Sequence, residues 1–448
     1  MNYTSLSDKD KKEMMAKIGI TSVDELFRSI PEGLRLKKVL NIPASLSEPE
    51  LLSFFEKVRV QNKCSDCLSF LGGGAYNHFI PYSVDYLSSR GEFLTPYTPY
   101  QPEVSQGTLQ IIFEFQTLIC QLTGMDIANA SLYDGASATA EAVLMAHRLQ
   151  GKPKALIAKT LNPQYREVIG TYVKNMAIEA EEVGYSSSGE IDFEDLKQKI
   201  DEETSVVVCQ SPNFMGVIEN IKKISELAHT HHSLCTAVIA EPVSLGILEA
   251  PGKLGADIAA GEGQSFGIPL SFGGPYLGFM ACKKDFIRQL PGRIAGQTTD
   301  VEGRRGFVLT LSTREQHIRR EKATSNICTN QAWCALRATV FLESLGQEGM
   351  KELALQNIHK ANYAREKLTQ LEGVKAIFSG SSFNEFVLQL PKDLTHINEF
   401  LEKKKIIAGL KLEEFYPELK NCALFCVTEM HRKEDIDNLV KSLNEGLG

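Results

Sequence analysis

Residues 256–282, with the sequence ADIAAGEGQSFGIPLSFGGPYLGFMAC, decide the fold that we predict for this chain. The apolar runs at 256–260 and 276–282 indicate two strands, and the stretch between them is rich in glycine and proline. Glycine is needed where a backbone bends sharply or approaches a ligand closely. No lysine occurs between Lys253 and Lys283, so the stretch offers no primary amine for covalent catalysis. On these residues alone, the favoured interpretation is a structural turn of an α/β domain.

Strands and helices alternate upstream of this turn. Strand-like runs lie at 154–158, 177–183, 205–209 and 237–240. Helical patterns, with apolar residues three or four positions apart, lie at 109–123, 136–149, 163–175, 193–200 and 220–229. Strands joined by helical crossovers predict a mainly parallel sheet that is covered on both faces.

The rest of the chain divides into two further regions. After residue 320, the sequence predicts helices and strands of a second, smaller α/β region, at 330–345, 351–371, 374–378, 386–390, 393–404, 406–410, 423–427 and 434–444. The first part has helical patterns at 8–18, 22–28 and 48–60, and then a Gly-, Pro- and Tyr-rich segment at 70–107 that is too long for a simple connection. We therefore predict an N-terminal helical section with an interface segment (1–107), a large α/β domain (108–320) and a smaller C-terminal α/β domain (321–448).

Composition excludes several classes of function. The chain has 448 residues, of which 43% are hydrophobic and 23% charged, and its formal net charge is −8. This balance is typical of a globular protein and does not favour a nucleic-acid partner. No apolar run approaches a membrane-spanning length, and the polar first residues do not resemble a signal peptide. Ten scattered cysteines suit a reducing compartment, so we expect a cytoplasmic protein with no membrane partner.

The start of the helix at 136–149 is a candidate phosphate site. Asp134, Ser137 and Thr139 lie around its first turn, where free backbone N–H groups and hydroxyls could hold an anion. The alternative is that Asp134 only caps the helix, and without other evidence that alternative is favoured.

Two other groups of residues are weak candidates for metal or redox sites. His229, His231 and His232, with Cys235 after them, superficially resemble metal ligands. Histidine is also favourable at the C-terminal end of a helix, and we expect no metal site. Cys64 and Cys67 form a single CxxC with no second pair, which favours an ordinary thiol pair of unassigned role. The glycines of the 261–267 stretch miss the dinucleotide spacing.

Two segments are more specific. In residues 92–107, prolines stiffen the chain and present Tyr97 and Tyr100 as amphipathic contact groups. Residues 314–331 gather Arg314, His317 and Arg319 just before the small domain. The alternative for the second segment is a solvated, charged linker.

These segments carry a resemblance to a known family. Residues 97–107, 134–142, 264–275 and 314–331 are similar, in the same order along the chain, to the P-protein of the glycine cleavage system, glycine decarboxylase. More narrowly, they resemble the first chain of the P-proteins that are divided between two chains. The resemblance covers nearly the whole chain and implies the aspartate-aminotransferase fold, which is fold-type I of the pyridoxal-phosphate enzymes.

The resemblance also implies how a cofactor is used. In this family one half of the protein keeps the lysine that binds pyridoxal phosphate covalently, and the homologous half has lost it. Here Gln264 aligns with the missing lysine, and Glu241 occupies the place of the aspartate that pairs with the pyridine nitrogen. The resemblance implies that the cofactor is bound by a partner, subunit 2, in an αβ or α2β2 complex. Asp134, Ser137, Thr139 and Glu241 would then be vestigial.

The implied reaction belongs to the complex. Glycine is decarboxylated with the cofactor as electron sink, and the aminomethyl group passes to the lipoyl arm of the H-protein. We predict that Tyr97, Tyr100 and Gln101 reach toward the partner's cofactor pocket. A second set would line its mouth or the subunit contact: Arg314, His317 and Arg319.

Two alternatives remain from the sequence. A self-sufficient pyridoxal-phosphate enzyme would need a lysine in the 261–275 loop, which is absent. A catalytically silent structural or regulatory paralogue would only stabilise subunit 2, and the segment around Tyr97 and Tyr100 discriminates it from a catalytic subunit.

Overall fold

The computed structural model describes residues 5–38, 40–62, 66–94, 98–327 and 329–448. By their contacts the residues divide into two compact units, Met1–Ser65 and Asp66–Gly448. Within the described ranges, no helix is both long enough and apolar enough to cross a bilayer.

The first unit contains the three helices that the sequence predicts, as α1 (Asp8–Ile18), the 3-10 helix η1 (Val23–Phe27) and α2 (Glu48–Gln61). It also contains a short 3-10 helix that was not predicted, η2 (Glu32–Leu34). Ser7, Ser22 and Ser47 begin α1, η1 and α2 with capping boxes, which satisfy the first backbone N–H groups. None of the residues in these four helices is buried, so their apolar side chains are available to a partner.

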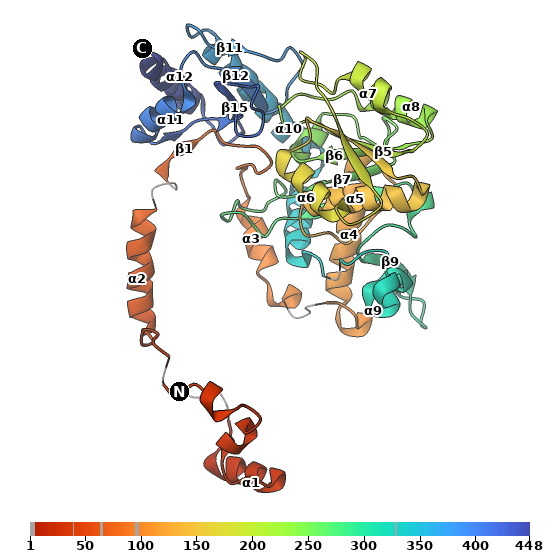
Figure 1. The fold of residues 1–448 in the computed structure, drawn as a ribbon, viewed down its shortest axis with the longest axis vertical. Coiled ribbons are helices and arrows are strands. Elements are labelled where there is room, and N and C mark those ends of the chain that lie inside the picture. The colour runs from red at the N-terminus through yellow and green to blue at the C-terminus, as the bar shows by residue number, and fades with distance from the viewer. Residues whose placement is uncertain (1–4, 39, 63–65, 95–97, 328) are drawn as a thin grey trace. The chain divides into compact units, whose positions relative to one another are not determined.

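A seven-stranded sheet is the centre of the second unit (Figure 1). Its strands follow the order β2-β8-β7-β6-β5-β3-β4, and the pairs from β7 to β4 are parallel, whereas β8 and β2 are antiparallel to their neighbours. The strands are β2 (Ile127–Ala128), β3 (Lys154–Ala158), β4 (Glu179–Val183), β5 (Thr204–Gln210), β6 (Leu234–Ile239), β7 (Ile258–Glu262) and β8 (Gly278–Cys282). The predicted mainly parallel sheet is confirmed.

Helices cover both faces of this sheet. On one face, α5 (Gly135–Gln150) and α6 (Pro163–Val173) pack on side chains such as Ile157 and Val208. On the other face, the neighbouring side chains Leu156 and Val207 share a core with four helices. These are α4 (Gln106–Thr123), α7 (Phe193–Lys199), α8 (Ile221–Thr230) and α10 (Ala332–Thr369). Successive strand residues thus face opposite layers, because the side-chain period of a strand is two.

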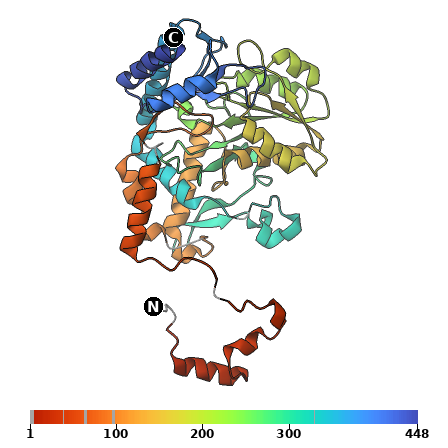
Figure 2. The same cartoon turned by 60° about the vertical axis from the view of Figure 1, so that its left-hand side comes forward.

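The C-terminal elements surround a second, antiparallel sheet of order β11-β12-β15-β14. It consists of β11 (Lys375–Ala376), β12 (Glu385–Gln389), β15 (Cys422–Cys426) and β14 (Leu410–Lys411), with α11 (Leu394–Lys403) and α12 (Lys433–Leu447) packed on it. Helix α10 contributes Ala361, Ala364 and Leu368 to this core. The turned view in Figure 2 shows the blue C-terminal elements apart from the yellow and green elements of the central sheet.

The two helices predicted at 330–345 and 351–371 are confirmed as the two parts of α10, which are separated by a kink where Gly346 has a φ of 60°. Two details differ from the sequence prediction. The strand predicted at 406–410 is two short strands, because β13 (Ile406–Ile407) pairs with β1 (Leu68–Ser69) and β14 pairs with β15. The hairpin of β9 (Ile294–Thr299) and β10 (Arg305–Thr310) was not predicted; the apolar run of β10 is only three residues long, 307–309, and β9 ends in the polar residues 297–299. The proposed domain borders at 107/108 and 320/321 stay predictions.

Candidate functional site

The candidate site lies where strands of the central sheet end. Glu241 follows β6, Glu262 is the last residue of β7, and Gln264 begins the glycine-rich turn. Ligands of open α/β sheets bind at the carboxyl ends of the parallel strands. The segment 72–79, which leads from β1 toward α3 (Tyr82–Ser88), lies against Glu241 and Gln264 through the contacts described below.

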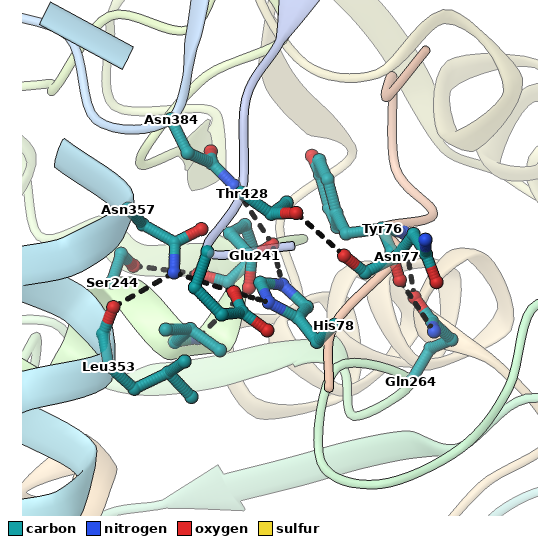
Figure 3. Close-up of polar contacts among 12 residues, drawn as sticks. Tyr76, Asn77, His78, Glu241, Ser244, Gln264, Leu353, Asn357, Asn384 and Thr428 are labelled. Carbon is teal, nitrogen blue, oxygen red and sulfur yellow. Dashed lines mark hydrogen bonds and ion pairs between the residues drawn. The ribbon is translucent and has the colours of Figure 1, made fainter. Parts of the chain in front are cut away.

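Gln264 fastens this segment to the turn (Figure 3). The buried side chain accepts a hydrogen bond from the Tyr76 N–H at 2.8 Å and donates one to the Tyr76 carbonyl at 2.9 Å. It also donates to the carbonyl of Ile268 at 2.7 Å. The amide is therefore used on both its oxygen and its nitrogen, and it holds the backbone of residue 76 in a fixed place.

Glu241 is paired with a histidine from the same segment (Figure 3). His78 Nε2 lies 3.0 Å from Glu241 Oε2, and each side chain is only 2% exposed. Asn384 Nδ2 donates to the same oxygen at 3.2 Å, and the Val243 N–H donates to Glu241 Oε1 at 3.0 Å. Both carboxylate oxygens of Glu241 thus have their partners within the chain.

A second carboxylate completes this pair. His78 Nδ1 lies 2.8 Å from Glu429 Oε2, which also accepts from Asn357 Nδ2 at 3.0 Å. Burial by itself lowers the pKa of His78, but pairing with Glu241 and Glu429 outweighs it and raises the pKa to about 10. For Glu429, burial raises the pKa, but the contact with His78 lowers it by more, so the pKa of Glu429 is below its ordinary value. We infer a charged imidazolium between two carboxylates.

The segment is also tied to the C-terminal sheet. Glu385, on β12, accepts hydrogen bonds from the Gly73 N–H at 2.6 Å and from the Tyr76 hydroxyl at 2.8 Å. Burial raises the pKa of Glu385 to about 7, partly offset by these two hydrogen bonds. Residues 73–78 are consequently held from both sheets.

The start of α5 is capped from within the chain. Asp134 Oδ1 accepts from the Ser137 N–H at 2.7 Å, and the Ser137 hydroxyl donates to the Asp134 carbonyl at 3.1 Å. Thr139 donates its hydroxyl to the Gly135 carbonyl at 2.7 Å. The Gly135 N–H donates to the carboxylate of Glu262 at 2.9 Å. These contacts support the helix-cap alternative for Asp134.

A separate cluster brings Tyr100 and His317 together. Their rings meet edge to face with centroids 5.5 Å apart. Arg293 donates from Nη2 to the Tyr100 hydroxyl at 3.1 Å and from Nη1 to Asn330 Oδ1 at 3.2 Å. Glu315 lies 3.6 Å from both Arg293 Nε and His317 Nδ1. Tyr100 is 50% exposed, so this cluster combines a buried ion pair with aromatic groups that reach the surface.

The ion pair of this cluster is incomplete. The side chains of Arg293 and Glu315 are buried, with 6% and 9% exposure. Among the described residues, Arg293 Nε and Glu315 Oε1 have no hydrogen-bond partner. Buried polar atoms are nearly always hydrogen-bonded in native proteins, so these two atoms are exceptions among the described residues.

Comparisons with known proteins agree with this geometry. The profile of the glycine cleavage system P-protein family matches residues 1–443. The chain belongs to this family. It is 50% identical to a probable glycine dehydrogenase (decarboxylating) subunit 1 of Desulfitobacterium hafniense, over 99% of this chain and 100% of that one. A crystal structure of glycine decarboxylase (P-protein), in inhibitor-bound form, is 42% identical and has a TM-score of 0.93, covering 100% of both chains.

The predicted fold class is confirmed by the structural neighbours of this P-protein chain. A sphingosine-1-phosphate lyase of Burkholderia pseudomallei, only 14% identical, has a TM-score of 0.69 over 93% of this chain and 94% of its own. Together with the P-protein, it places the chain among the fold-type I enzymes. The family and the fold support use of pyridoxal phosphate.

The residues of this P-protein chain do not fit that cofactor. The 261–275 turn contains no lysine, and the Gln264 side chain within it is hydrogen-bonded to Tyr76 and Ile268. Glu241 is engaged with His78, and the first N–H of α5 with Glu262. Each group that would bind ring or phosphate already has a partner in the chain.

The other predicted site residues of the P-protein chain have different surroundings. Arg314 is buried and donates to the carbonyls of Leu290, Gly292 and Leu311, which does not support a place at an open mouth. Arg319 is exposed and its Nε donates to the Thr313 carbonyl at 3.1 Å. Gln101 is exposed and precedes the 3-10 helix η5 (Pro102–Val104). Tyr97 and Cys64 lie outside the described residues.

Several residues of the site were missed from the sequence. Glu262 and Glu315 lie inside the segments 256–282 and 314–331, which the sequence marks as candidates, but a single glutamate forms no recognisable motif. The missed residues are His78, Glu262, Arg293, Glu315 and Glu429. No regular spacing in the sequence relates any of them to the residues that they contact. His229, a weak metal candidate, instead pairs with Asp257 at 2.8 Å.

Proposed function

We propose that this chain is the first subunit of a two-chain glycine decarboxylase of the glycine cleavage system. With subunit 2, which carries the cofactor lysine, it decarboxylates glycine and passes the aminomethyl group to the lipoyl arm of the H-protein. The observation that carries the proposal is full-length similarity to a solved glycine decarboxylase, in a chain whose 261–275 turn contains no lysine.

In this proposal the chain forms one wall of a site shared with subunit 2. Tyr100 and His317 form its polar, surface-reaching part, with Tyr97, Gln101 and Arg319 nearby in the sequence. Arg293 and Glu315 are positioning residues, because the Arg293 Nη2 contact orients the Tyr100 hydroxyl and Glu315 faces the His317 ring. Arg314 stabilises the backbone beside this part of the site, because its guanidinium donates to the carbonyls of Leu290 and Gly292.

The first unit provides a surface for subunit 2. Helix α2 exposes Leu52, Phe54 and Phe55 by 65%, 52% and 59%. Obligate interfaces bury more than about 2,000 Å² and are rich in such side chains. We propose that this surface belongs to the contact in the αβ or α2β2 complex, and that the isolated chain self-associates.

The test is glycine-dependent exchange of labelled bicarbonate, with lipoylated H-protein and pyridoxal phosphate present. Neither subunit should catalyse exchange alone, and the mixture should. Tyr100→Phe in the complex removes one hydrogen bond to a charged group, which at about 1.5 kcal/mol corresponds to about tenfold less exchange.

Tyr363→Phe is the matched control. Tyr363, on α10, donates its hydroxyl to Asp437 at 2.6 Å on the C-terminal side of the chain, and its loss should leave exchange unchanged. If Tyr97→Ala and Tyr100→Ala leave the activity of the complex intact, the chain is the silent paralogue instead.

A further inference from the structure

The carboxylate of Glu262 accepts backbone hydrogen bonds at the beginning of α5, and burial raises its pKa to about 7. Its Oε2 accepts from the Gly135 N–H at 2.9 Å, and its Oε1 accepts from the N–H groups of Leu277 at 2.8 Å and Gln264 at 3.1 Å. The side chain is 2% exposed. A helix N-terminus with converging N–H groups is the usual place for a phosphate in an α/β protein.

The surroundings leave no room for an external anion at that place. A Cβ atom at Gly135 would overlap the Tyr165 hydroxyl and lie 2.9 Å from Glu262 Cβ, so glycine is needed for the close approach. Two further N–H groups of the first turn are used within the chain, since that of Ser137 donates to the Asp134 side chain and that of Ala138 to the Asp134 carbonyl.

The cavity beside this place also opposes an anion. It has a volume of about 500 Å³ and is lined by Asp134 and Glu262 together with glycines and aromatic residues. Among the described residues that line it, there is no lysine, arginine or histidine. A phosphate dianion would meet two carboxylates and no compensating cation, which is unfavourable.

We propose that Glu262 is a built-in replacement for the phosphate of a cofactor, so that this chain contains an internal ligand and not a vacant cofactor site. The other two points of cofactor recognition are filled in the same way, Glu241 by His78 and position 264 by the Tyr76 backbone. The internal ligand completes the fold at the sheet edge without any small molecule.

The proposal is tested with Glu262→Ala in the full-length chain, using inorganic phosphate as the probe. Removing the carboxylate leaves three N–H donors without an acceptor beside an open cavity. We expect the thermal midpoint of Glu262→Ala to be lower than that of the wild type in chloride, and to rise with phosphate at equal ionic strength. The wild-type midpoint should not respond to phosphate.

Glu219→Ala is the matched control. Glu219 is also buried and also accepts backbone and side-chain hydrogen bonds, from Ile191, Asn213 and Thr160, but it is not at the start of α5. Its loss should lower the midpoint without any recovery in phosphate. If Glu262→Ala fails to fold in chloride, phosphate during refolding should restore soluble protein for this variant and not for Glu219→Ala.

Three results would overturn the proposal. They are stabilisation of the wild type by phosphate, an equal response of both variants, and a Glu262→Ala chain that phosphate neither stabilises nor rescues. None of these outcomes depends on decarboxylase activity, so the proposed function is tested separately.

Discussion

Replacing Gln264 with lysine restores an amine at the aligned position, yet we predict that it destabilises the chain and creates no activity. The Gln264 side chain accepts from the Tyr76 N–H and donates to the carbonyls of Tyr76 and Ile268. A lysine can donate to both carbonyls but accepts no hydrogen bond. The Tyr76 N–H therefore loses its acceptor in a buried place.

The cost follows from two effects. An unsatisfied buried N–H costs about 1 to 3 kcal/mol. Burial lowers the pKa of a lysine by up to about 3 to 5 units, and three units correspond to about 4 kcal/mol. Together these effects reach about 5 to 7 kcal/mol, which is comparable with the total stability of about 5 to 15 kcal/mol of a typical protein.

The assay is guanidinium unfolding followed by the fluorescence of Trp333, the one tryptophan of the chain. Gln264→Met separates the two effects, because methionine is similar in length, uncharged and unable to accept the Tyr76 N–H. We expect Gln264→Met to lose about 1 to 3 kcal/mol and Gln264→Lys about 4 kcal/mol more. A lysine variant as stable as the wild type, or one that releases carbon dioxide from glycine without subunit 2, would refute this reasoning.

Three further predictions concern the other contacts. Because the pKa of His78 is raised to about 10, its proton stabilises the native state fully below about pH 6.5, and this stability is lost as the pH rises through about 10, with a slope of up to about 1.4 kcal/mol per pH unit. We therefore expect the unfolding free energy of His78→Asn, measured in urea between about pH 7 and 10, to fall less with rising pH than that of the wild type. Equal slopes for the two proteins would contradict the charged imidazolium. Gly135→Ala should lower the unfolding free energy by about 1 to 3 kcal/mol, because the added Cβ overlaps Tyr165. Gly107→Ala is the control, since its Cβ meets no described atom within 4 Å, and it should be neutral or slightly stabilising. Equal losses of stability in the two variants would contradict the close approach of Gly135 to Tyr165. Arg293→Lys should reduce glycine-dependent bicarbonate exchange by the complex about tenfold, because lysine lacks the planar guanidinium that reaches two partners. An unchanged exchange rate would show that Arg293 does not position groups of the shared site.

The sequence predicted the fold well where a single element carries the signal. The runs at 154–158 and 205–209 are apolar because both faces of β3 and β5 are covered, and helix–strand alternation predicts the parallel sheet. That the 261–275 turn cannot form a covalent imine also follows from residue type, since this chemistry requires an amine and the turn has no lysine.

The contacts of the site could not be predicted in the same way. Glu262 meets Gly135 across 127 positions, and His78 meets Glu241 across 163. Nothing in the spacing of these residues marks the pairing, because it is formed only when separate strands end at the same edge. Arg314 shows the converse case, since a cationic residue suggested a binding surface, but its guanidinium bonds three main-chain carbonyls.

Locating the cofactor in the active complex tests most directly the claim that this chain shares a site without holding a cofactor. The complex with subunit 2 is assembled with pyridoxal phosphate, reduced with borohydride, and digested for peptide mass spectrometry. We predict that the phosphopyridoxyl group is found only on a lysine of subunit 2, and that the reduced complex has lost glycine-dependent exchange. Modification of a lysine of this chain, such as Lys253 or Lys283, in proportion to that loss would contradict the account.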